Sequence, residues 1–348
     1  MKKVKEQINT ENYSIYCADC MDVISEIPDN SIDLSVYSPP FAGLYNYSSD
    51  YRDFSNCETK EQFLDQYDFL IAQMARVTKP GRITSVHVTD VHTNTGRLWD
   101  FPGEVIKLHE KHGFEYHNRI TIWKEPLKVR MRTMVQSLMH KFIVEDATKC
   151  FPAMPDYVLI FKKHGENKVP VTHENGLNDY PYFGETPFLD AHKETYGNYE
   201  DFRKKWRSFK GDQKENKLSH LTWQRYASSV WDDVRIDNIL PFKDTKEEDD
   251  EKHVHPLQLD VIDRIVYLYS NENEVILTPF MGVGSEVYSS VSMNRKGVGI
   301  ELKDSYFKQA IENLKLAERR FTHTKQATIF DSIHGAYERI VINEDTQQ

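Results

Sequence analysis

The chain has 348 residues, of which 39% are hydrophobic and 28% charged, a composition typical of globular proteins and unlike that of disordered or collagen-like chains. This length suits one large α/β domain with a sizeable insertion, or two ordinary domains. The formal net charge of -10 gives no ground for expecting a nucleic-acid partner, so a DNA-binding surface would have to be a local basic patch. Neither a signal peptide nor a membrane span is predicted, and we expect a cytoplasmic protein.

The cysteines predict no metal centre. Of the four, Cys17 and Cys20 form one C-x-x-C pair, while Cys57 and Cys150 stand apart. A zinc ribbon would need a second pair at matching spacing, so we expect reduced thiols and no bound metal.

The first half of the chain alternates strand and helix patterns. Apolar alternation predicts strands and a 3.6-residue period predicts helices. In chain order we expect a strand at 13–19, a helix at 21–27, strand 32–37, helix 61–77, strand 83–89, helix 103–112, strand 119–123 and strand 156–163. Lys79-Pro80-Gly81 is expected to end the second helix. This alternation is typical of a doubly wound, mostly parallel sheet.

The pattern changes at about residue 164 and resumes near residue 259. The segment between has few aliphatic runs, a basic aromatic cluster at 202–210 and a charge run at 244–252 that is typical of a solvated loop. A helix at 259–270, a strand from 274, a helix from 285, a strand from 296 and a helix from 305 then follow. We therefore divide the chain into a first half of the α/β domain at 1–163, an inserted module at 164–230, the second half at 231–320 and an extension at 321–348.

A glycine turn follows the strand that begins near residue 274. The sequence VILTPFMGVGS at 275–285 brings Gly282 and Gly284 to the end of an apolar strand, where a backbone free of side chains can approach a ligand. A tight structural turn is the alternative. About twenty residues later, the next strand ends in Glu301, whose carboxylate can accept both hydroxyls of a ribose. The combination favours an adenosine-containing ligand over a surface glutamate.

A rigid tetrapeptide, Ser38-Pro39-Pro40-Phe41, directly follows strand 32–37. Two consecutive prolines hold the backbone extended, which suits the lip of a catalytic site. Most such turns do no chemistry, so by itself this signal leaves a structural loop as the alternative.

Together these motifs resemble the bacterial and phage DNA amino-methyltransferases, the N4-cytosine and N6-adenine family. The catalytic motif of that family is [DNS]-P-P-[YFW], here Ser38 to Phe41, and its cofactor motif resembles D-P-F-x-G-S-G-T, here Thr278 to Ser285. Four further similarities are Cys17-Ala18-Asp19, Lys79-Pro80-Gly81, Trp123-Lys124 and His255-Pro256. The likeness covers roughly 13–163 and 231–320 and implies a Rossmann-like S-adenosylmethionine-dependent methyltransferase fold.

The order of the motifs resembles the β arrangement of this family, in which the segment between them is the target-recognition domain. The chain departs from the pattern at Thr278, where the family usually has aspartate, and at Val283-Gly284-Ser285. The resemblance implies S-adenosyl-L-methionine as cofactor. The residues that it places at the cofactor are Asp19, Thr278, Phe280, Gly282, Gly284, Ser285, Glu301, His255 and Pro256. The alternative role for Asp19 is that of a helix cap, and the alternative for His255 is a surface histidine without a ligand contact.

The mechanism that the resemblance implies needs neither metal nor covalent intermediate. The Ser38 side chain and the Pro39 carbonyl would accept the two N–H bonds of the amino group, which localises the nitrogen lone pair. Phe41 would stack on a base flipped out of double-stranded DNA. Serine at the first position favours N4 of cytosine, and N6 of adenine is the alternative.

Basic residues that could contact phosphates occur in two segments, and a solvated charged face is the alternative for both. They are Lys128, Arg130, Arg132 and Lys141 in the first, and Arg203, Lys204, Lys205, Arg207 and Lys210 in the second. Three other functions stay open: an RNA methyltransferase, a small-molecule methyltransferase, and an inactive DNA-binding relative. A cognate restriction endonuclease as partner, and a monomeric or homodimeric state, are open as well.

Overall fold

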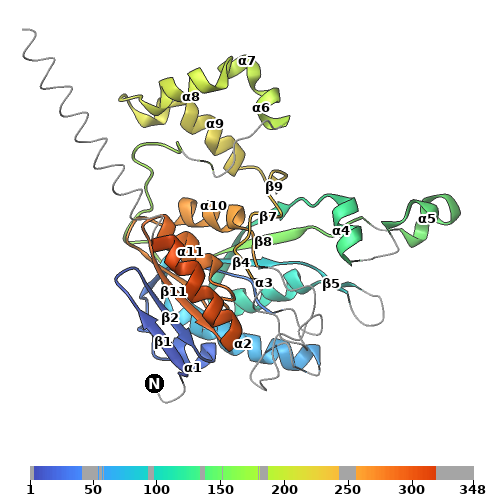
Figure 1. Ribbon diagram of the computed structural model, residues 1–348, viewed down its shortest axis with the longest axis vertical. Coiled ribbons are helices and arrows are strands. Elements are labelled where there is room, and N and C mark those ends of the chain that lie inside the picture. Colours follow the sequence, from blue (N-terminus) through green and yellow to red (C-terminus); the bar gives the residue numbers. More distant parts are fainter. Residues whose placement is uncertain are drawn as a thin grey trace, which may run out of the picture.

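A nine-stranded sheet forms the centre of the computed structural model, which describes residues 4–40, 54, 57, 59–92, 98–133, 138–150, 152–178, 180, 187–242 and 256–318 (Figure 1). Its strands are β1 (Glu6–Asn9), β2 (Tyr13–Cys17), β3 (Ile32–Tyr37), β4 (Thr78–Val88), β7 (Phe114–Ile122), β8 (Asp156–Lys163), β9 (Val230–Trp231), β10 (Val275–Thr278) and β11 (Lys296–Glu301). They lie in the order β1-β2-β11-β10-β3-β4-β8-β7-β9. A separate two-stranded ribbon pairs β5 (Val91–His92) with β6 (Leu98–Trp99).

The middle of the sheet is parallel. β2, β11, β10, β3 and β4 run parallel to one another, while β1 is antiparallel to β2, and β8 is antiparallel to both β4 and β7. From β10 the chain proceeds to its neighbour β11, whereas from β3 it proceeds to β4 on the opposite side. The winding direction therefore reverses between β10 and β3. This arrangement confirms the predicted doubly wound, mostly parallel α/β fold.

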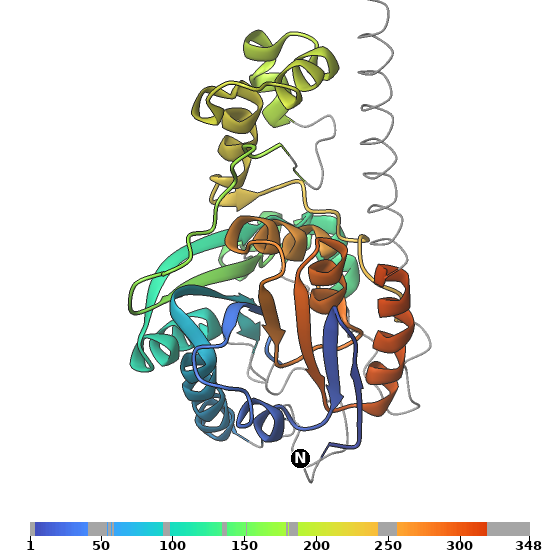
Figure 2. The same ribbon diagram turned by 90° about the vertical axis from the view of Figure 1, so that its left-hand side faces the viewer.

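Helices cover both faces of the sheet (Figures 1 and 2). One face packs against α1 (Cys20–Ile24), α2 (Lys60–Val77) and α3 (Phe101–Lys111). The other packs against α10 (Leu259–Tyr269), α11 (Ser285–Ser292) and a helix over residues 304–318. Strands covered on both faces need apolar residues on both, which is why every residue of β3 is buried. No helix in the described part of the chain is long and apolar enough to span a membrane.

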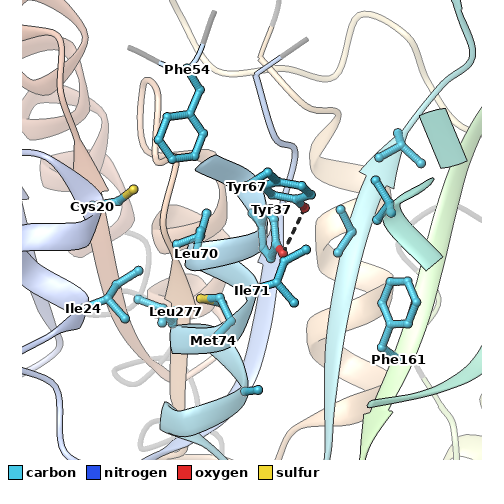
Figure 3. Close-up of a cluster of buried hydrophobic side chains, with 14 of the residues drawn as sticks. Cys20, Ile24, Tyr37, Phe54, Tyr67, Leu70, Ile71, Met74, Phe161 and Leu277 are labelled. Carbon is cyan, nitrogen blue, oxygen red and sulfur yellow. Dashed lines mark hydrogen bonds between the residues drawn. The ribbon is translucent and has the colours of Figure 1, made fainter. Parts of the chain in front are cut away.

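The core under α2 is rich in aromatic rings (Figure 3). Thr59 caps the helix, and positions spaced three and four apart point to the sheet, so Phe63, Tyr67 and Met74 are fully buried. The buried hydroxyl groups of Tyr67 and Tyr37 lie 3.3 Å apart and satisfy one another. This contact ties the helix to β3, the strand that leads to Ser38.

Four helices form a separate group beyond the sheet (Figure 1). They are α6 (Pro187–Ala191), α7 (Lys193–Tyr196), α8 (Tyr199–Arg207) and α9 (Lys217–Tyr226). Leu189, Phe202, Leu218 and Leu221 make a small core of their own. These helices lie within the predicted insertion. Two further helices, α4 (Pro126–Thr133) and α5 (His140–Glu145), follow β7 and extend to the right of the sheet in Figure 1.

The strand β4 differs from its expected form. We expected Lys79-Pro80-Gly81 to separate the helix from a strand at 83–89, but β4 begins at Thr78. Thr78 pairs with Ile32 and Ile83 with Leu34, so the additional residues form a bulge. Gly81 supplies the positive φ of 73° that this bulge needs. The helix ends before this tripeptide, as predicted, but the tripeptide lies within β4 and not in a loop.

Two phenylalanines of α2 offer a matched test of this core. Phe63 is fully buried against the rings of Tyr67, Trp99 and Phe101, whereas Phe69 is 67% exposed. We expect Phe63→Ala to lower the free energy of unfolding by about 3–5 kcal/mol, because it removes a buried ring and leaves a cavity. Phe69→Ala should change it by less than about 0.5 kcal/mol. Urea unfolding of both variants measures the difference, and equal effects would contradict the packing described.

Candidate active site

Several of the predicted site residues meet at one edge of the sheet. Parallel strands β2, β11, β10 and β3 are neighbours, so their carboxyl ends lie side by side. The register places Glu301 opposite Cys17, and Thr278 opposite Gly299. Ser38 follows β3 directly, next to the point at which the winding reverses. Ligands of doubly wound sheets bind outside such a reversal, so this edge is the candidate site.

The glycine turn after β10 is held by the carboxylate of Glu301. The backbone N–H of Gly282 donates to its Oε2 at 2.8 Å, and that of Lys303 donates to its Oε1 at 2.9 Å. Carboxylate oxygens accept hydrogen bonds, which is the chemistry that the hydroxyls of a ribose require. Both residues come from turns at the same edge, which fixes the carboxylate in place.

The two glycines of the turn serve different purposes. Gly282 has a φ of 54°, and no described heavy atom comes within 4 Å of the point where a Cβ would lie. Gly284 has a φ of 92°, and a Cβ there would lie 3.2 Å from Ala310. The first therefore leaves open space at the sheet edge, and the second permits close packing of the turn on the last helix.

Two buried hydroxyl groups near the turn are unsatisfied. The Oγ1 of Thr278 and the Oγ of Ser285 are buried without a hydrogen-bond partner among the described residues. Buried polar atoms seldom lack a partner, so these two fit a site that takes up a polar ligand. Phe280 lies between them in sequence, and its ring contacts those of Tyr37 and Phe54. Phe280 thereby joins the glycine turn to the core under β3.

Two acidic residues flank the turn. Asp19 caps α1, since its Oδ1 accepts the N–H of Met21 at 2.8 Å. A helix cap was the predicted alternative to a cofactor contact for this residue. Glu286 lies buried in the first turn of α11. Burial, together with the nearby Glu301, raises the pKa of Glu286 to about 8.

The Ser38 hydroxyl is half-buried and donates to the backbone carbonyl of His87 at 3.1 Å. The Pro39 side chain is buried, and that of Pro40 is partly exposed. Phe41 and His255 lie outside the described residues, and Pro256 stands just before the cap of α10. The structure thus brings Ser38 to the same edge as the glycine turn.

Beside Ser38 lies a group of polar residues that the sequence did not single out as site residues. The Nδ1 of His87 is 3.4 Å from the Ser38 Oγ, and its Nε2 is 3.1 Å from the Oδ2 of Asp156. The Nζ of Lys124 is 2.5 Å from the other oxygen, Oδ1, of Asp156. Polar residues at the ends of three predicted strands were the available signal, but their proximity depends on strand order.

The basic residues proposed for DNA contact lie in two separate parts of the structure, α4 with α5 and the region of α8 (Figure 1). Lys128 and Arg130 are on α4 and Lys141 is on α5, while the side chain of Arg132 lies outside the described part. Those of the second segment lie along α8, with four on the helix and one just after it: Arg203, Lys204, Lys205, Arg207 and Lys210. Most of these side chains are exposed, so they are accessible to a polyanion.

Comparison with known proteins relates the chain to one family of DNA methyltransferases. The model of an N6 and N4 methyltransferase family, described as DNA methylase, matches residues 32–312. The type II methyltransferase M.BglII of Bacillus subtilis is 26% identical over 84% of this chain and 66% of its own length. M.BamHI of Bacillus amyloliquefaciens is 24% identical over 87% of this chain and 57% of its own length. The chain thus spans about three fifths of the length of these two relatives.

Solved structures share the fold. TTHA0409 of Thermus thermophilus, solved as a complex with S-adenosyl-L-methionine, matches with a TM-score of 0.57 and 18% identity, covering 88% of this chain and 95% of that one. PvuII DNA methyltransferase, described as cytosine-N4-specific, matches with a TM-score of 0.52 and 12% identity, over 92% and 95% of the two chains. The predicted methyltransferase fold is therefore confirmed.

The buried carboxyl of Glu286 should make stability depend on pH. A carboxyl whose pKa is raised by folding favours the folded state at low pH and loses that contribution as pH rises, here from about 4.5 towards about 8. We expect Glu286→Gln, which cannot ionise, to be more stable than the wild type at pH 9 and to differ less at pH 5. Thermal unfolding across this range measures it, and a constant difference would contradict the buried, protonated carboxyl.

Proposed function

Because the chain belongs to the N6 and N4 DNA methylase family, we propose that it is an enzyme that methylates an exocyclic amino group of a base in DNA. The observation that carries the proposal is that two motifs lie side by side where the winding direction of the sheet reverses. Ser38, after β3, and the Gly282 turn, after β10, lie at the ends of neighbouring strands. An acceptor for the amino group and a cofactor turn at adjacent strand ends are what this reaction requires.

S-adenosyl-L-methionine supplies an electrophilic methyl group on its sulfonium. Glu301, whose carboxylate is oriented by the backbone N–H groups of Gly282 and Lys303, would accept hydrogen bonds from the ribose hydroxyls. Gly282 leaves room for close approach, and the buried hydroxyls of Thr278 and Ser285 offer partners to the polar groups of the cofactor. Phe280 and Gly284 support this turn, while Asp19, His255 and Pro256 complete the proposed set.

The amino group of a base is a weak nucleophile because its lone pair is delocalised into the ring. Since the Ser38 hydroxyl donates to the His87 carbonyl, its lone pairs are directed towards incoming N–H donors. In the proposal, Ser38 Oγ and the Pro39 carbonyl accept the two amino hydrogens, which frees the nitrogen lone pair for attack. Pro40 keeps the backbone extended, and Phe41 stacks on the flipped base.

Cytosine N4 is the proposed methyl acceptor. Ser38 is a neutral acceptor, which suits the cytosine amine, and the PvuII enzyme with a similar fold is described as cytosine-N4-specific. Adenine N6 is the second candidate, favoured by the similarity to YhdJ of Escherichia coli, a DNA adenine methyltransferase that is 22% identical over 89% of this chain and 85% of its own length.

The inserted module at 164–230 is the proposed target-recognition region. Its helices α6–α9 form a compact group with its own core, apart from the sheet. α8 carries Arg203, Lys204 and Arg207, and its charge suits DNA phosphates despite the net charge of -10 of the chain. Lys128, Arg130, Arg132 and Lys141 would contact the duplex from the other side.

Replacing the proposed acceptor tests the reaction. We expect Ser38→Ala to lower the rate of methyl transfer to double-stranded DNA by about 100-fold, because one preorganised hydrogen bond to the amino group is lost. The assay uses labelled S-adenosyl-L-methionine, unmodified duplex DNA and nucleoside mass spectrometry. Cofactor affinity should not change.

Ser25→Ala, at the exposed end of α1, is the matched control and should retain full activity. N4-methylcytosine as product would support the full proposal. N6-methyladenine would support the proposed mechanism but show that adenine, and not cytosine, is the methyl acceptor. Methylation of RNA or of a small molecule but not of DNA would contradict the proposed substrate. Cofactor binding without any transfer would favour an inactive relative.

Glu301 provides a separate test of the cofactor site. Glu301→Gln replaces one carboxylate oxygen with an N–H donor, so it should weaken S-adenosyl-L-methionine binding by about tenfold or more. Glu312→Gln, which removes an exposed carboxylate paired with Lys315, is the control and should bind normally. Isothermal titration calorimetry gives both affinities, and equal values would exclude Glu301 from the site.

A further inference from the structure

Four polar side chains behind the methyl-acceptor site come from four neighbouring strands. Ser38, His87, Asp156 and Lys124 lie at or just beyond the ends of β3, β4, β8 and β7, which are adjacent in the sheet. The register pairs Tyr37 with Val86, His87 with Val158, and Ile122 with Asp156. Residues two apart on a strand share a face, so all four side chains lie on one face of the sheet.

The contacts form a continuous series. The Oγ of Ser38 lies 3.4 Å from the Nδ1 of His87, whose Nε2 lies 3.1 Å from the Oδ2 of Asp156. The Nζ of Lys124 is 2.5 Å from the Oδ1 of Asp156. The Asp156 side chain is 8% exposed and that of His87 is 11% exposed. Such a buried carboxylate is costly unless it is paired, and here both of its oxygens have partners.

The charge of Asp156 favours one tautomer of His87. Burial by itself would raise the pKa of Asp156, but Lys124 and His87 hold that pKa well below the usual range. The Nε2 of His87 faces this carboxylate at 3.1 Å but has no hydrogen-bond partner among the described residues. The negative charge of Asp156 favours a hydrogen rather than a lone pair on this nitrogen when the ring is neutral. The Nδ1 then has a lone pair, and it faces the Ser38 hydroxyl.

The proposed reaction creates a need for such a lone pair. As the amino nitrogen bonds to the methyl carbon and the sulfur–carbon bond breaks, the sulfur becomes neutral and the nitrogen becomes positive. One N–H proton must then leave for a neutral methylamino product to form. The Ser38 hydroxyl cannot keep a second proton, so a proton acceptor behind it would complete this transfer.

We propose that His87, positioned by Asp156 and Lys124, is the base that takes up this proton through Ser38. The inference rests on the proposed function and assigns residues that act behind the acceptor. The N–H proton moves to the Ser38 Oγ as the hydroxyl proton moves from Oγ to the His87 Nδ1. The Ser38 O–H, which donates to the backbone carbonyl of His87, reaches the Nδ1 of His87 by rotating away from that carbonyl. The resulting imidazolium is stabilised by Asp156 and later releases its proton to solvent.

The central test compares His87→Ala with His112→Ala, since His112 also pairs with a carboxylate, Asp68, at 2.8 Å but lies at the end of α3. Under single-turnover conditions with duplex DNA, His87→Ala should slow methyl transfer by about 100-fold. It should also change the pH dependence of the rate. Added imidazole should restore part of the rate, and cofactor affinity should not change. His112→Ala should behave as the wild type.

A second measurement does not depend on activity. In protein labelled with ¹⁵N-histidine, NMR reports which ring nitrogen carries the hydrogen, and the His87→Ala spectrum assigns the signal. The Nε2–H form at neutral pH is expected. The Nδ1–H form would overturn the proposal, because no lone pair would then face Ser38.

The outcomes separate this inference from the proposed function. An active wild type with a His87→Ala variant of normal rate and pH profile would overturn the role of His87 alone. A slow variant with an unchanged pH profile and no response to imidazole would also overturn it, since a purely structural role predicts that result. A wild type that transfers no methyl group to DNA would overturn both the proposed function and the role inferred for His87.

Discussion

Ile276 on β10 lies opposite Leu34 on β3, and this parallel pairing joins two segments that are remote in the sequence. The N–H of Val275 donates to the carboxylate of Asp33, 242 residues away in sequence. Leu34 and Ile276 are buried in the same apolar cluster under α10. The pairing thus combines main-chain hydrogen bonds with apolar burial, and the reversal of winding exists only because it forms. Without it, the glycine turn and Ser38 would not share an edge.

The charged groups around this edge are held rather than free to reorient. The Glu301 carboxylate accepts two backbone N–H groups, and that of Asp156 lies between Lys124 and His87. A buried charge without such partners would cost several kcal/mol. Because the partners come from the sheet and its tight turns, the acceptors keep their directions before any ligand arrives. Preorganised dipoles of this kind stabilise developing charge without reorganising during the reaction.

Sequence patterns predicted those parts of the fold that depend on local burial. The strands at 32–37 and 156–163 are apolar runs because helices cover both faces of the sheet, and their bounds agree with β3 and β8. The glycine turn and Glu301 could be paired because one helix and one strand separate them. The helices α6–α9 escaped notice because they are short and their core relies on few aliphatic residues.

The contact of His87 with Asp156 could not be predicted in the same way. It requires β8 to lie antiparallel between β4 and β7, and the periodicity of a strand says nothing about which strands become its neighbours. The bulge in β4 was missed for a related reason. Lys79-Pro80-Gly81 has the composition of a turn, but Thr78 and Ile83 on either side of it pair with β3, and Gly81 lies close to the backbone of Asn167.

The strand order also bears on how the protein is made. β2 and β3 follow one another in the chain, but β11 and β10 lie between them in the sheet. As the ribosome synthesises the chain from its amino end, β2 and β3 emerge long before the two strands that separate them. Until those strands arrive, both have unpaired backbone groups that attract other chains or chaperones. A product truncated before β10 therefore lacks the middle of the sheet, and a complete site can form only after β10 and β11 have been synthesised.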